Sequence, residues 1–577
     1  MRSHRNLLIA FLVVLALACT AAAAPMRPVH APRAMVASVH ELASRAGVEM
    51  MQAGGNAVDA AVATGFALAV VHPQAGNLGG GGFMLIRMAD GATRFIDYRE
   101  KAPAAATADM YLDSHGNVIE NASLVGYKAV GVPGSVAGLA FAQKAYGKLP
   151  LEQVMAPAIK LARDGFPLAW EDAQDLHDKD LAQFSESKRI FQRDGNYFKQ
   201  GEELRQPELA RTLERISKNP DEFYHGAMAR ELAAAIQKGG GLITFKDLAQ
   251  YEVKEREVIR GTYRDYDIIS APPPSSGGIA LLEILNILEG YDLAKTGNRS
   301  AKAIHLTAEA FRRAFYDRAE FLGDPDFAKI PVAQLIDKRY AAGWRESIDP
   351  AHASISKDLH RPAVFNELER YANSHLSGPG VVREPENTTH YSVVDPAGNA
   401  VAVTTTLNDT LGSRVTVEGL GFLLNDEMDD FASKQGVPNA YGLIQGPANA
   451  IGPGKRPLSA MTPTIVLKDG KLFLVLGSPG GPTIITTVAN ALMGVVDFGL
   501  DIQESVNAPR FHHQWLPDEI RVEDRISPDT ITLLQNKGHK VEVEHFWGDG
   551  ECIAIDPKTG ERLGASDGRN NGKAVGF

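Results

Sequence analysis

The stretch ENTTHYSVVD at 386–395 places a threonine, Thr388, where a polar, turn-like segment gives way to the alternating pattern of a strand. A threonine hydroxyl is a weak nucleophile until a base removes its proton. One solution is to make the threonine the first residue of a chain, so that its own α-amino group is the base. A free α-amino group has a pKa of about 7.7–8.0, so a useful fraction of it is neutral at neutral pH. Cleavage of the Asn387–Thr388 bond would create that amine. The residues alone also allow an ordinary strand start, because threonine is common in strands.

Two further patterns in the last third of the chain could serve acyl-transfer chemistry. GSPGG ends a strand pattern and begins a helical one, so Gly480 and Gly481 can aim backbone N–H groups at a developing negative charge. A tight turn would also require glycine at these positions. The acidic run NDEMDDF places Glu427 and Asp430 on one face of a helical turn. Acidic runs are commonly only solvated, so this pattern alone does not define a site.

His390 invites a catalytic role, because it lies two residues after Thr388 and therefore on the same face of the strand. An N-terminal amine would already supply the base, so we expect a structural histidine.

Other kinds of site are considered and set aside. The glycine run GNLGGGG at 76–82 lacks the G-K-[ST] ending of a phosphate-binding loop, and it follows a helix and precedes a strand, the reverse of the usual order. The HHQ triplet at 512–514 lacks the helical spacing of metal ligands. We therefore expect no metal and no cofactor. We also expect that a serine hydrolase with a nucleophile elbow does not apply.

The elements that precede Thr388 are predicted to be mainly helical. The segment 38–56 is typical of a helix that begins with a capping box of Ser38 and Glu41. A second helix at 57–71 is apolar on nearly every face, which indicates burial. A hairpin around ADGA then follows the glycine run, and from about 130 to 350 the periodicity is mostly helical.

The elements that follow are richer in strands. TTHYSVVD and NAVAVTTTLN predict two strands joined by a turn at PAG, and 464–477 predicts a hairpin with a DG turn. Helical patterns follow near 483–497 and 502–508. The segment SGPGVVREPEN at 377–387 is predicted to be a loop, so Thr388 lies at the boundary between the helix-rich and strand-rich parts.

The composition limits the class of protein. The chain has 577 residues, of which 44% are apolar, so it is too long for one simple core. Residues 1–24 combine a short basic start, a twelve-residue apolar run and small residues, which is typical of a signal peptide. The net charge of −11 argues against a nucleic-acid partner. Of two cysteines only Cys552 would remain after processing, and no later segment is predicted to cross a membrane. We expect a periplasmic or secreted protein.

Six motifs, in their order along the chain, resemble the γ-glutamyltranspeptidase family: GNLGGGGFM, DYREKAP, NTTHYSVVD, PNAYGLIQGPANAIGPGKRPLSAMTPTIV, GSPGG and NAPRFHHQWLPDEIRVE. The resemblance covers essentially all of the chain after the predicted signal peptide. It implies an α+β fold, the αββα sandwich of an N-terminal-nucleophile hydrolase. It also implies a precursor that cuts itself into a large subunit, 25–387, and a small catalytic subunit, 388–577, which form a heterodimer.

The same resemblance assigns catalytic roles to individual residues. Thr388 would both cleave the bond after Asn387 and accept the acyl group. Thr406 would support the Thr388 hydroxyl, although from the residues alone it is an ordinary strand threonine. Gly480 and Gly481 would bind the oxyanion.

Further residues are assigned to the substrate by the resemblance. Glu427 and Asp430 would contact the α-ammonium group of the substrate, with Asn408 nearby. Arg99 would hold its α-carboxylate, where a bidentate guanidinium is apt. Ser459 would donate a hydrogen bond to the same carboxylate.

One departure from the family pattern concerns that carboxylate. The family usually has two serines after RPL, whereas here Ser459 is followed by Ala460, so one hydroxyl donor is missing. The segment PNAYGLIQGPANAIGPGKRP resembles the family's lid loop, in which Tyr441 would close over the site.

The function that the resemblance implies is removal of the γ-glutamyl group from glutathione and related compounds through a Thr388 ester. The group would pass to water or to an amino acid or dipeptide acceptor. The alternative is an acylase of the same fold that acts on other dicarboxylic acyl groups. Two anions at Glu427 and Asp430 argue against that alternative, because they would be buried without an ammonium partner.

Overall fold

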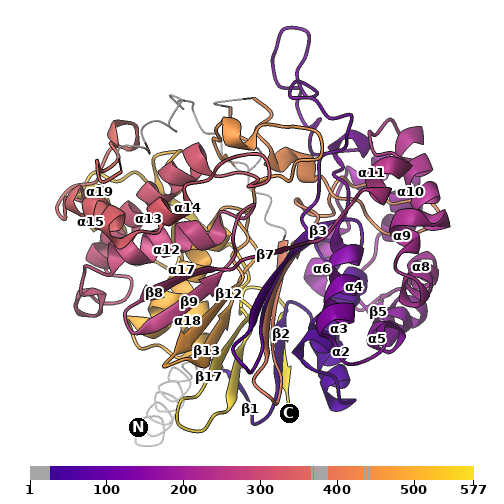
Figure 1. Cartoon of the computed structure of the whole chain (residues 1–577), viewed down its shortest axis with the longest axis horizontal. Coiled ribbons are helices and arrows are strands. Elements are labelled where there is room, and N and C mark those ends of the chain that lie inside the picture. The colour runs from indigo at the N-terminus through magenta and orange to yellow at the C-terminus, as the bar shows by residue number, and fades with distance from the viewer. Residues whose placement is uncertain (1–25, 366–367, 369–387, 435–436, 440–441) are drawn as a thin grey trace, which may run out of the picture.

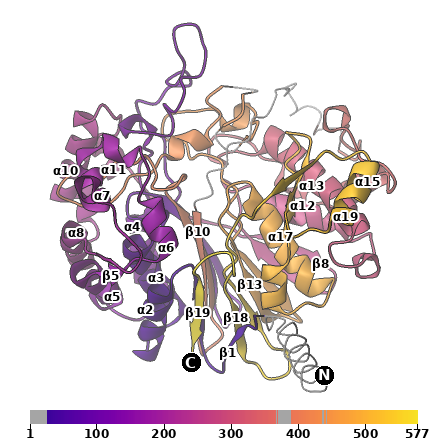
Figure 2. The same cartoon turned by 180° about the vertical axis from the view of Figure 1, so that it is seen from behind.

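The computed structural model describes residues 26–365, 368, 388–434, 437–439 and 442–577. Two seven-stranded sheets lie face to face in the middle of the molecule, and helices cover the outer face of each sheet (Figures 1 and 2). Within both sheets every pair of neighbouring strands is antiparallel. This arrangement of four layers confirms the predicted α+β fold and its αββα sandwich.

The strands of each sheet come from both sides of Thr388. The first sheet has the order β19 (Lys573–Gly576), β2 (Met35–Ser38), β10 (Thr388–Val394), β11 (Ala400–Thr406), β3 (Gly81–Arg87), β4 (Thr93–Asp97), β7 (Lys254–Arg256). The second has the order β1 (Val29–Ala31), β18 (Arg562–Ala565), β17 (Cys552–Ile555), β13 (Lys471–Leu476), β12 (Thr464–Lys468), β9 (Tyr266–Ser270), β8 (Ile259–Tyr263).

Helices within residues 41–249 cover the first sheet, and helices from residue 277 onward cover the second sheet (Figure 1). The first group includes α2 (Glu41–Gln52), α3 (Ala57–Val71), α4 (Ser135–Tyr146), α5 (Leu151–Asp164), α6 (Trp170–Asp175), α7 (Ser185–Gln192), α8 (Pro207–Lys218), α9 (Glu222–His225), α10 (Ala227–Lys238) and α11 (Phe245–Ala249). The second group includes α12 (Gly277–Leu288), α13 (Ala301–Phe321), α14 (Val332–Leu335), α15 (Lys338–Glu346), α17 (Thr483–Val496), α18 (Ile502–Asn507) and α19 (Pro528–Asn536). Two minor sheets pair β14 (Phe511–His512), β15 (Ile520–Glu523) and β16 (Val541–Glu544), and β5 (Phe166–Pro167) with β6 (Glu203–Leu204).

Three apolar layers hold the sandwich together. One fills the space between the first sheet and its helices, one the space between the second sheet and its helices, and a smaller one lies between the two sheets. Helix α3 illustrates the first of these, because all fifteen of its residues are buried. The helix predicted at 57–71 is therefore confirmed, and so is its burial.

The capping box predicted at Ser38 is wrong. Ser38 is the last residue of β2, where it pairs with Tyr391 of β10 and Lys573 of β19. The helix begins at Glu41, and the His40 side chain caps it by accepting a hydrogen bond from the backbone N–H of Leu42. Pairing with two neighbouring strands fixes residues 35–38 in an extended conformation, which removes Ser38 from the helix.

The prediction of a helix-rich part before Thr388 is also incomplete. Five strands, β1, β2, β7, β8 and β9, belong to that part and complete the two sheets. The hairpins β3–β4, β10–β11 and β12–β13 and the helices α17 and α18 lie where the sequence predicts them. In the part of the chain that the structure describes, no helix is long and apolar enough to cross a bilayer.

Candidate active site

Thr388 and Thr406 lie directly opposite each other at the ends of two central strands. They are paired residues in the antiparallel ladder of β10 and β11. Alternate residues of these strands face opposite sides of the sheet. Val394 and Ala402, at even positions, pack between the two sheets, whereas Val393, at an odd position, packs against the helices. Thr388 and Thr406 share the even positions, so both side chains face the layer between the sheets.

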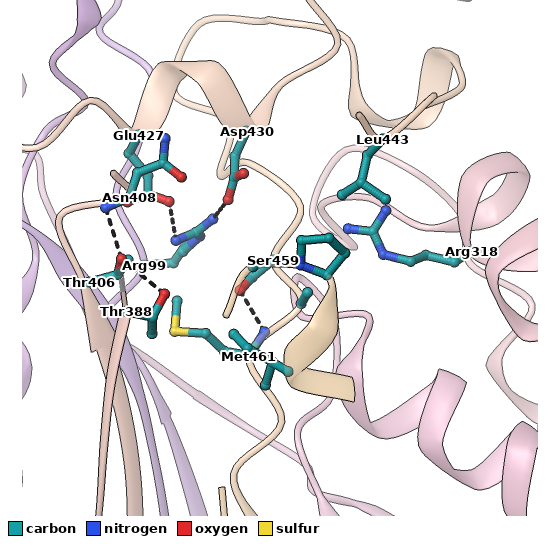
Figure 3. Close-up of a pocket in the computed structure, with 14 residues that line it drawn as sticks. Arg99, Arg318, Thr388, Thr406, Asn408, Glu427, Asp430, Leu443, Ser459 and Met461 are labelled. Atoms are coloured by element: carbon teal, nitrogen blue, oxygen red, sulfur yellow. Dashed lines mark hydrogen bonds and ion pairs between the residues drawn. The ribbon is translucent and has the colours of Figure 1, made fainter. Parts of the chain in front are cut away.

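A chain of hydrogen bonds leads from Asn408 to Thr388 (Figure 3). The Asn408 backbone N–H donates to Thr406 Oγ at 2.8 Å, and Thr388 Oγ donates to Thr406 Oγ at 3.3 Å. The backbone of Asn408 has a φ of 83°, a left-handed conformation that asparagine adopts more readily than most residues. Thr388 keeps 7% of its surface exposed, so its hydroxyl lies at the edge of a cavity rather than in the core.

The glycine run at 76–82 supports Thr406. The Asn77 side chain donates to the carbonyl oxygen of Thr406 at 2.8 Å and accepts from the backbone N–H of Gly80 at 3.0 Å. A Cβ atom on Gly80 would lie only 2.0 Å from that same carbonyl oxygen. Close approach of two backbones therefore requires glycine here. This packing role was not recognised in the sequence.

Gly480 and Gly481 form the turn that links β13 to α17. Their φ angles are 124° and 51°, which favour glycine. Gly481 lines the same cavity as Thr388, and the carbonyl of Gly480 accepts hydrogen bonds from the backbone and side chain of Thr483. The structure thus brings the turn to Thr388, and its role toward an oxyanion stays a prediction.

Arg99 contacts the two predicted anions of the site. It forms an ion pair of 2.5 Å with Glu427 and another with Asp430, and Glu100 lies 3.5 Å away. Figure 3 shows the Arg99 side chain between Glu427 and Asp430, close to Thr388. Glu427 and Asp430 lie in the 3-10 helix η6, Glu427–Asp430, as their spacing predicts. The residues predicted for the substrate carboxylate and ammonium are therefore paired with one another.

Burial strongly affects the protonation of this cluster. Burial would lower the pKa of Arg99, but Glu427, Asp430 and Glu100 together raise it, so the guanidinium is charged. Burial raises the pKa of Glu427 well above its usual value and that of Glu100 to about 7. Two acids thus share one arginine with a third nearby, and the cluster is suited to accept a further cation.

Fourteen described residues line this cavity, which has a volume of about 20 Å³. They are Arg99, Arg318, Thr388, Thr406, Asn408, Glu427, Asp430, Leu443, Ser459, Ala460, Met461, Gly481, Pro482 and Ile484. Eight of the ten residues that were predicted for catalysis or substrate binding therefore line one cavity. Of the other two, Gly480 is adjacent to it in sequence, and Tyr441 lies outside the described residues. Asn387, predicted at the cleavage point, also lies outside them.

Arg318 is a member of the cavity that sequence reasoning missed. It lies on α13, its side chain is buried, and burial lowers its pKa to about 10. Its Nε donates to Ser276 Oγ at 2.9 Å, and Ser276 Oγ donates to the carbonyl of Ser459 at 2.6 Å. The Ser459 hydroxyl accepts from the N–H of Met461 at 3.0 Å. Nothing in the charged sequence DRAEF separates Arg318 from a solvated helix face.

His390 lies in the interior, as predicted for a structural residue. Its ring nitrogens lie 2.8 Å from Thr404 Oγ and 3.2 Å from Ser392 Oγ. Burial lowers its pKa to about 3, so it is neutral at neutral pH. Among these contacts there is none to Thr388.

A metal site is one alternative to a threonine nucleophile. Among the described residues, one group of side chains of metal-ligand type lies close enough together to share an ion: His305, Glu309 and His539. The two histidine rings hydrogen-bond to each other at 2.8 Å, and Glu309 forms an ion pair with Arg313 at 2.6 Å, so each of the three side chains already has a partner. The prediction that no metal or cofactor is needed stays a prediction.

The exclusion of a serine hydrolase assumed that the chain has no G-x-S-x-G sequence, and that assumption is wrong, because one occurs at 564–568. Ser566 is buried beyond the end of β18, and its hydroxyl donates to Glu551 at 2.7 Å. No helix of the structure begins after it, since the chain continues into β19. The strand-to-helix elbow that such a nucleophile requires is absent here.

Relatives of known sequence match almost the whole chain. The glutathione hydrolase proenzyme of Escherichia coli K12 is 52% identical over 547 residues, which cover 94% of this chain and 91% of the relative. The acylase ACY 1 proenzyme of Pseudomonas sp. SE83 is 37% identical over 560 residues, covering 95% and 94%.

Solved structures show the same architecture. A cephalosporin acylase from Bacillus halodurans superposes with a TM-score of 0.79 at 28% identity, covering 97% of this chain and 98% of that one. A chain of the Helicobacter pylori gamma-glutamyltranspeptidase has a TM-score of 0.55 at 45% identity, covering 56% of this chain and 93% of that one. A family model described as gamma-glutamyltranspeptidase matches residues 43–577. This chain belongs to the gamma-glutamyltranspeptidase family.

Proposed function

We propose that this protein is a self-processing enzyme that cleaves the γ-glutamyl amide of glutathione and related compounds. The acyl group would be held as an ester on Thr388 and then transferred to water or to the amine of an amino acid or dipeptide. The observation that carries the proposal is the cavity in which Thr388, Thr406 and the Arg99 cluster meet. Identity of 52% to a glutathione hydrolase proenzyme supports the choice of donor.

The charges of the cavity suit an amino-acid head group. Two arginines, Arg99 and Arg318, and two acidic residues, Glu427 and Asp430, line it. A γ-glutamyl group carries one α-ammonium and one α-carboxylate, so it can exchange partners with the Arg99 ion pairs without leaving a charge unpaired. Burial makes such pairing important, since an unpaired buried charge is costly.

The proposed chemistry requires a free amine on Thr388. Thr388 Oγ attacks the γ-carbonyl carbon while the α-amino group takes its proton, and that proton then passes to the departing amine. The Thr406 hydroxyl, fixed by the Asn408 N–H, orients the Thr388 hydroxyl. The turn at Gly480 and Gly481 would supply N–H donors to the oxyanion. We also propose Asn408 and Ser459 as contacts of the head group, and Tyr441 as the residue that closes over it.

Maturation follows from the same nucleophile. We propose that Thr388 cleaves the bond after Asn387, giving a large subunit of 25–387 and a small subunit of 388–577 that stay together as a heterodimer. A signal peptide at 1–24 would direct the chain to the periplasm or the exterior.

An acylase is the alternative function, because a cephalosporin acylase shares the fold. The argument that Glu427 and Asp430 would lack a partner in an acylase does not hold, since Arg99 pairs with both. The lower identity of 37% to an acylase, against 52% to a glutathione hydrolase, favours the γ-glutamyl donor.

The decisive experiment is to incubate the purified, processed protein with glutathione, with and without a dipeptide. We expect release of glutamate without the dipeptide and a new γ-glutamyl dipeptide with it. Glutaryl-7-aminocephalosporanic acid, which lacks the α-ammonium, serves as the competing donor. Cleavage of this compound but not of glutathione would instead identify an acylase.

Thr388→Ala gives a test of the nucleophile itself. We expect the variant to remain a single chain of full length on a denaturing gel, whereas the wild-type protein shows two chains, the smaller beginning Thr-Thr-His-Tyr-Ser. Amino-terminal sequencing of the small chain is the measurement. Thr388→Ser, which keeps a hydroxyl, is the matched control and should still be processed. An active single chain would contradict the mechanism.

A further inference from the structure

Thr388 lies between two cavities, and only one of them has been described so far. The second cavity has a volume of about 230 Å³. Its lining residues are Val39, His40, His72, Gln74, Glu171, Asp172, Asp175, Thr388, Pro479, Phe546, Gly548, Asp549, Asn570 and Asn571. Neighbouring residues of one turn line the two cavities. Pro479, just before Gly480, lines the second cavity, and Gly481 lines the first. An acyl group on Thr388 can therefore be approached from both sides.

The charges of the second cavity differ from those of the first. Four carboxylates line it, Glu171, Asp172, Asp175 and Asp549, and neither lysine nor arginine is among its lining residues. Its two histidines do not balance them, because burial lowers the pKa of His40 and lowers that of His72 to about 4. The first cavity suits a zwitterion, whereas the second suits a cation.

Within the part of the chain that the structure describes, no lysine or arginine forms an ion pair with the three carboxylates of α6, Glu171, Asp172 and Asp175. The Gln74 amide donates to both Asp172 at 2.9 Å and Asp175 at 3.2 Å, and an amide carries no charge. Burial, together with repulsion by Asp172 and Glu171, raises the pKa of Asp175 to about 7. A ligand cation beside Asp175 would relieve that repulsion.

Asp549, from another segment of the lining, gives a second and independent observation. It is 1% exposed, and neither of its carboxylate oxygens makes a hydrogen bond of standard geometry to any described residue. Asn570 and Glu551 lie near enough to affect its pKa, which burial and Asp567 raise to about 7. A buried carboxylate without a donor is costly, so a donor that arrives with a ligand would be favoured.

A metal ion fits this cavity less well than an ammonium group. Among the described residues, the only group of three ligand types within 4.8 Å of one another is His305, Glu309 and His539, which lies elsewhere. The carboxylates of the cavity are therefore too dispersed to coordinate one ion together. Dispersed acceptors suit an ammonium group and a second cationic group of one extended molecule.

We propose that this second cavity binds the amine of the acceptor, an amino acid or short peptide, and selects acceptors with a positive charge. The proposal rests on the proposed function. The Thr388 α-amino group takes one proton from the bound ammonium group, and the nitrogen, now neutral, bonds to the γ-carbonyl carbon of the ester. The bond from that carbon to Thr388 Oγ breaks, and Oγ takes up the second proton that the nitrogen gives up. The products are a γ-glutamyl amide and a free Thr388 hydroxyl.

Three variants each remove the charge of one carboxylate that lines the cavity: Asp549→Asn, Asp175→Asn and Glu171→Gln. Glu171 is exposed, so its replacement is compatible with folding even if a buried replacement is not. Glu152→Gln is the control, because Glu152 is an exposed carboxylate of α5 that does not line the cavity. Each variant is first shown to be processed into two chains.

The donor in this experiment is γ-glutamyl-p-nitroanilide, whose leaving group is uncharged, and the acceptors are glycylglycine, glycylarginine and glycylglutamate. Release of glutamate without acceptor measures hydrolysis. For the cavity variants we expect the acceptor KM to rise at least about fivefold while hydrolysis stays within about twofold, since only one charged hydrogen bond is lost. The wild-type protein should prefer glycylarginine to glycylglutamate, and the variants should lose that preference.

The outcomes separate the two proposals. No release of glutamate by the wild-type protein would refute the proposed function itself. Normal hydrolysis with unchanged acceptor KM and unchanged charge preference in all three variants would refute the acceptor site alone. Equal losses of hydrolysis and transfer in all three would show that the carboxylates are structural, and transfer that EDTA abolishes would point to a metal site.

Discussion

Arg99, Glu427 and Asp430 form a set of ion pairs that a substrate can exchange. The α-carboxylate of a donor would replace the two acids as the partner of Arg99, and its α-ammonium would replace Arg99 as the partner of the acids. The two ion pairs among these residues in the free site would thus become three in the complex, one to Arg99 and two to the ammonium group. Because the cluster is buried, each exchanged pair contributes more than a surface pair would. The site would therefore select its donor by both the charges of the head group and their positions.

Asp430→Asn tests the anionic half of that exchange. We expect kcat/KM to fall at least about tenfold for a γ-glutamyl anilide, since a hydrogen bond to a charged group contributes about 1.5–3 kcal/mol. The loss for the glutaryl anilide, which has the carboxylate but no ammonium, should be smaller. Steady-state kinetics on both donors measure the difference.

Asp429→Asn is the matched control for that experiment. Asp429 lies in the same turn, but its carboxylate accepts from Ser123 at 2.6 Å rather than pairing with Arg99. It should leave the ratio between the two donors unchanged. Equal losses on both donors for Asp430→Asn would place Asp430 in a structural role.

Ala460→Ser tests the missing hydroxyl. Ala460 lines the cavity beside Ser459, so an added hydroxyl can reach the carboxylate. We expect KM for the donor to fall about two- to tenfold, because a neutral hydrogen bond contributes about 0.5–1.5 kcal/mol. The carboxylate is remote from the scissile amide, so kcat should change little. A donor with an amidated α-carboxylate is the control, on which part of the gain should vanish. An unchanged KM on the free carboxylate would show that another group already fills the position.

Most of the candidate site was assigned by resemblance to a known family, because residue types and spacing alone left an ordinary alternative for each residue. Spacing did predict that Glu427 and Asp430, three residues apart, share one turn, and that Thr388 begins a strand. The contact of Arg99 with both acids could not be predicted from spacing, because it joins segments more than three hundred residues apart. Arg318 was missed for a similar reason: its burial depends on how α13 packs, which its charged neighbours do not reveal.

At the scale of the elements, the site depends on where β10 and β11 end. The glycine run before β3 packs against the last residue of β11, and the turn after β13 brings Gly481 beside Thr388. At Gly80 only glycine allows the two backbones to come so close, since an added Cβ atom would meet the carbonyl oxygen of Thr406. The elements therefore fix the Thr388–Thr406 distance through backbone contacts, before any side chain is considered.

Gly80→Ala tests this arrangement. The added Cβ would lie 2.0 Å from the carbonyl oxygen of Thr406, so β11 must shift. Overpacking of this kind costs about 1–3 kcal/mol, and we expect a lower melting temperature and much slower processing of the precursor. Gly452→Ala is the control, since the nearest atom to its Cβ would be Lys455 Cδ at 3.8 Å. Processing of Gly80→Ala at the wild-type rate would contradict the proposed coupling.

The elements that sequence reasoning missed are short strands completed by distant partners. Strand β2 has four residues and lies between β10 and β19, and β7 has three residues at the edge of the same sheet. So few residues carry too little periodicity to identify a strand. Pairing with distant strands determines their conformation. Because Ser38 pairs within β2, helix α2 begins at Glu41 and not at the predicted capping box of Ser38.

The whole molecule is one sandwich to which both prospective subunits contribute. Each sheet contains strands from before and from after residue 388, and the central pair β10–β11 lies between β2 and β3. Removing the small subunit would expose both faces of the apolar layer between the sheets. Neither subunit can therefore keep its sheets without the other.

We accordingly expect the two processed chains to elute together in size-exclusion chromatography under native conditions. In urea they should unfold in a single transition, observed at the same midpoint by far-ultraviolet circular dichroism and by the loss of co-elution. Active protein from which one chain can be removed without denaturant would contradict this. Separate midpoints for the two chains would contradict it as well.

The position of Thr388 at the start of a central strand also has a consequence for gene expression. Ribosomes begin chains with methionine, so a separately encoded small subunit would carry an extra residue in front of its threonine. An aminopeptidase would have to remove that residue, and once the sheet has formed a side chain that is 7% exposed offers such an enzyme little access. A single gene whose product cuts itself after folding avoids this difficulty. Attempts to produce the two chains from separate genes would therefore have to generate the threonine terminus before the sheets assemble.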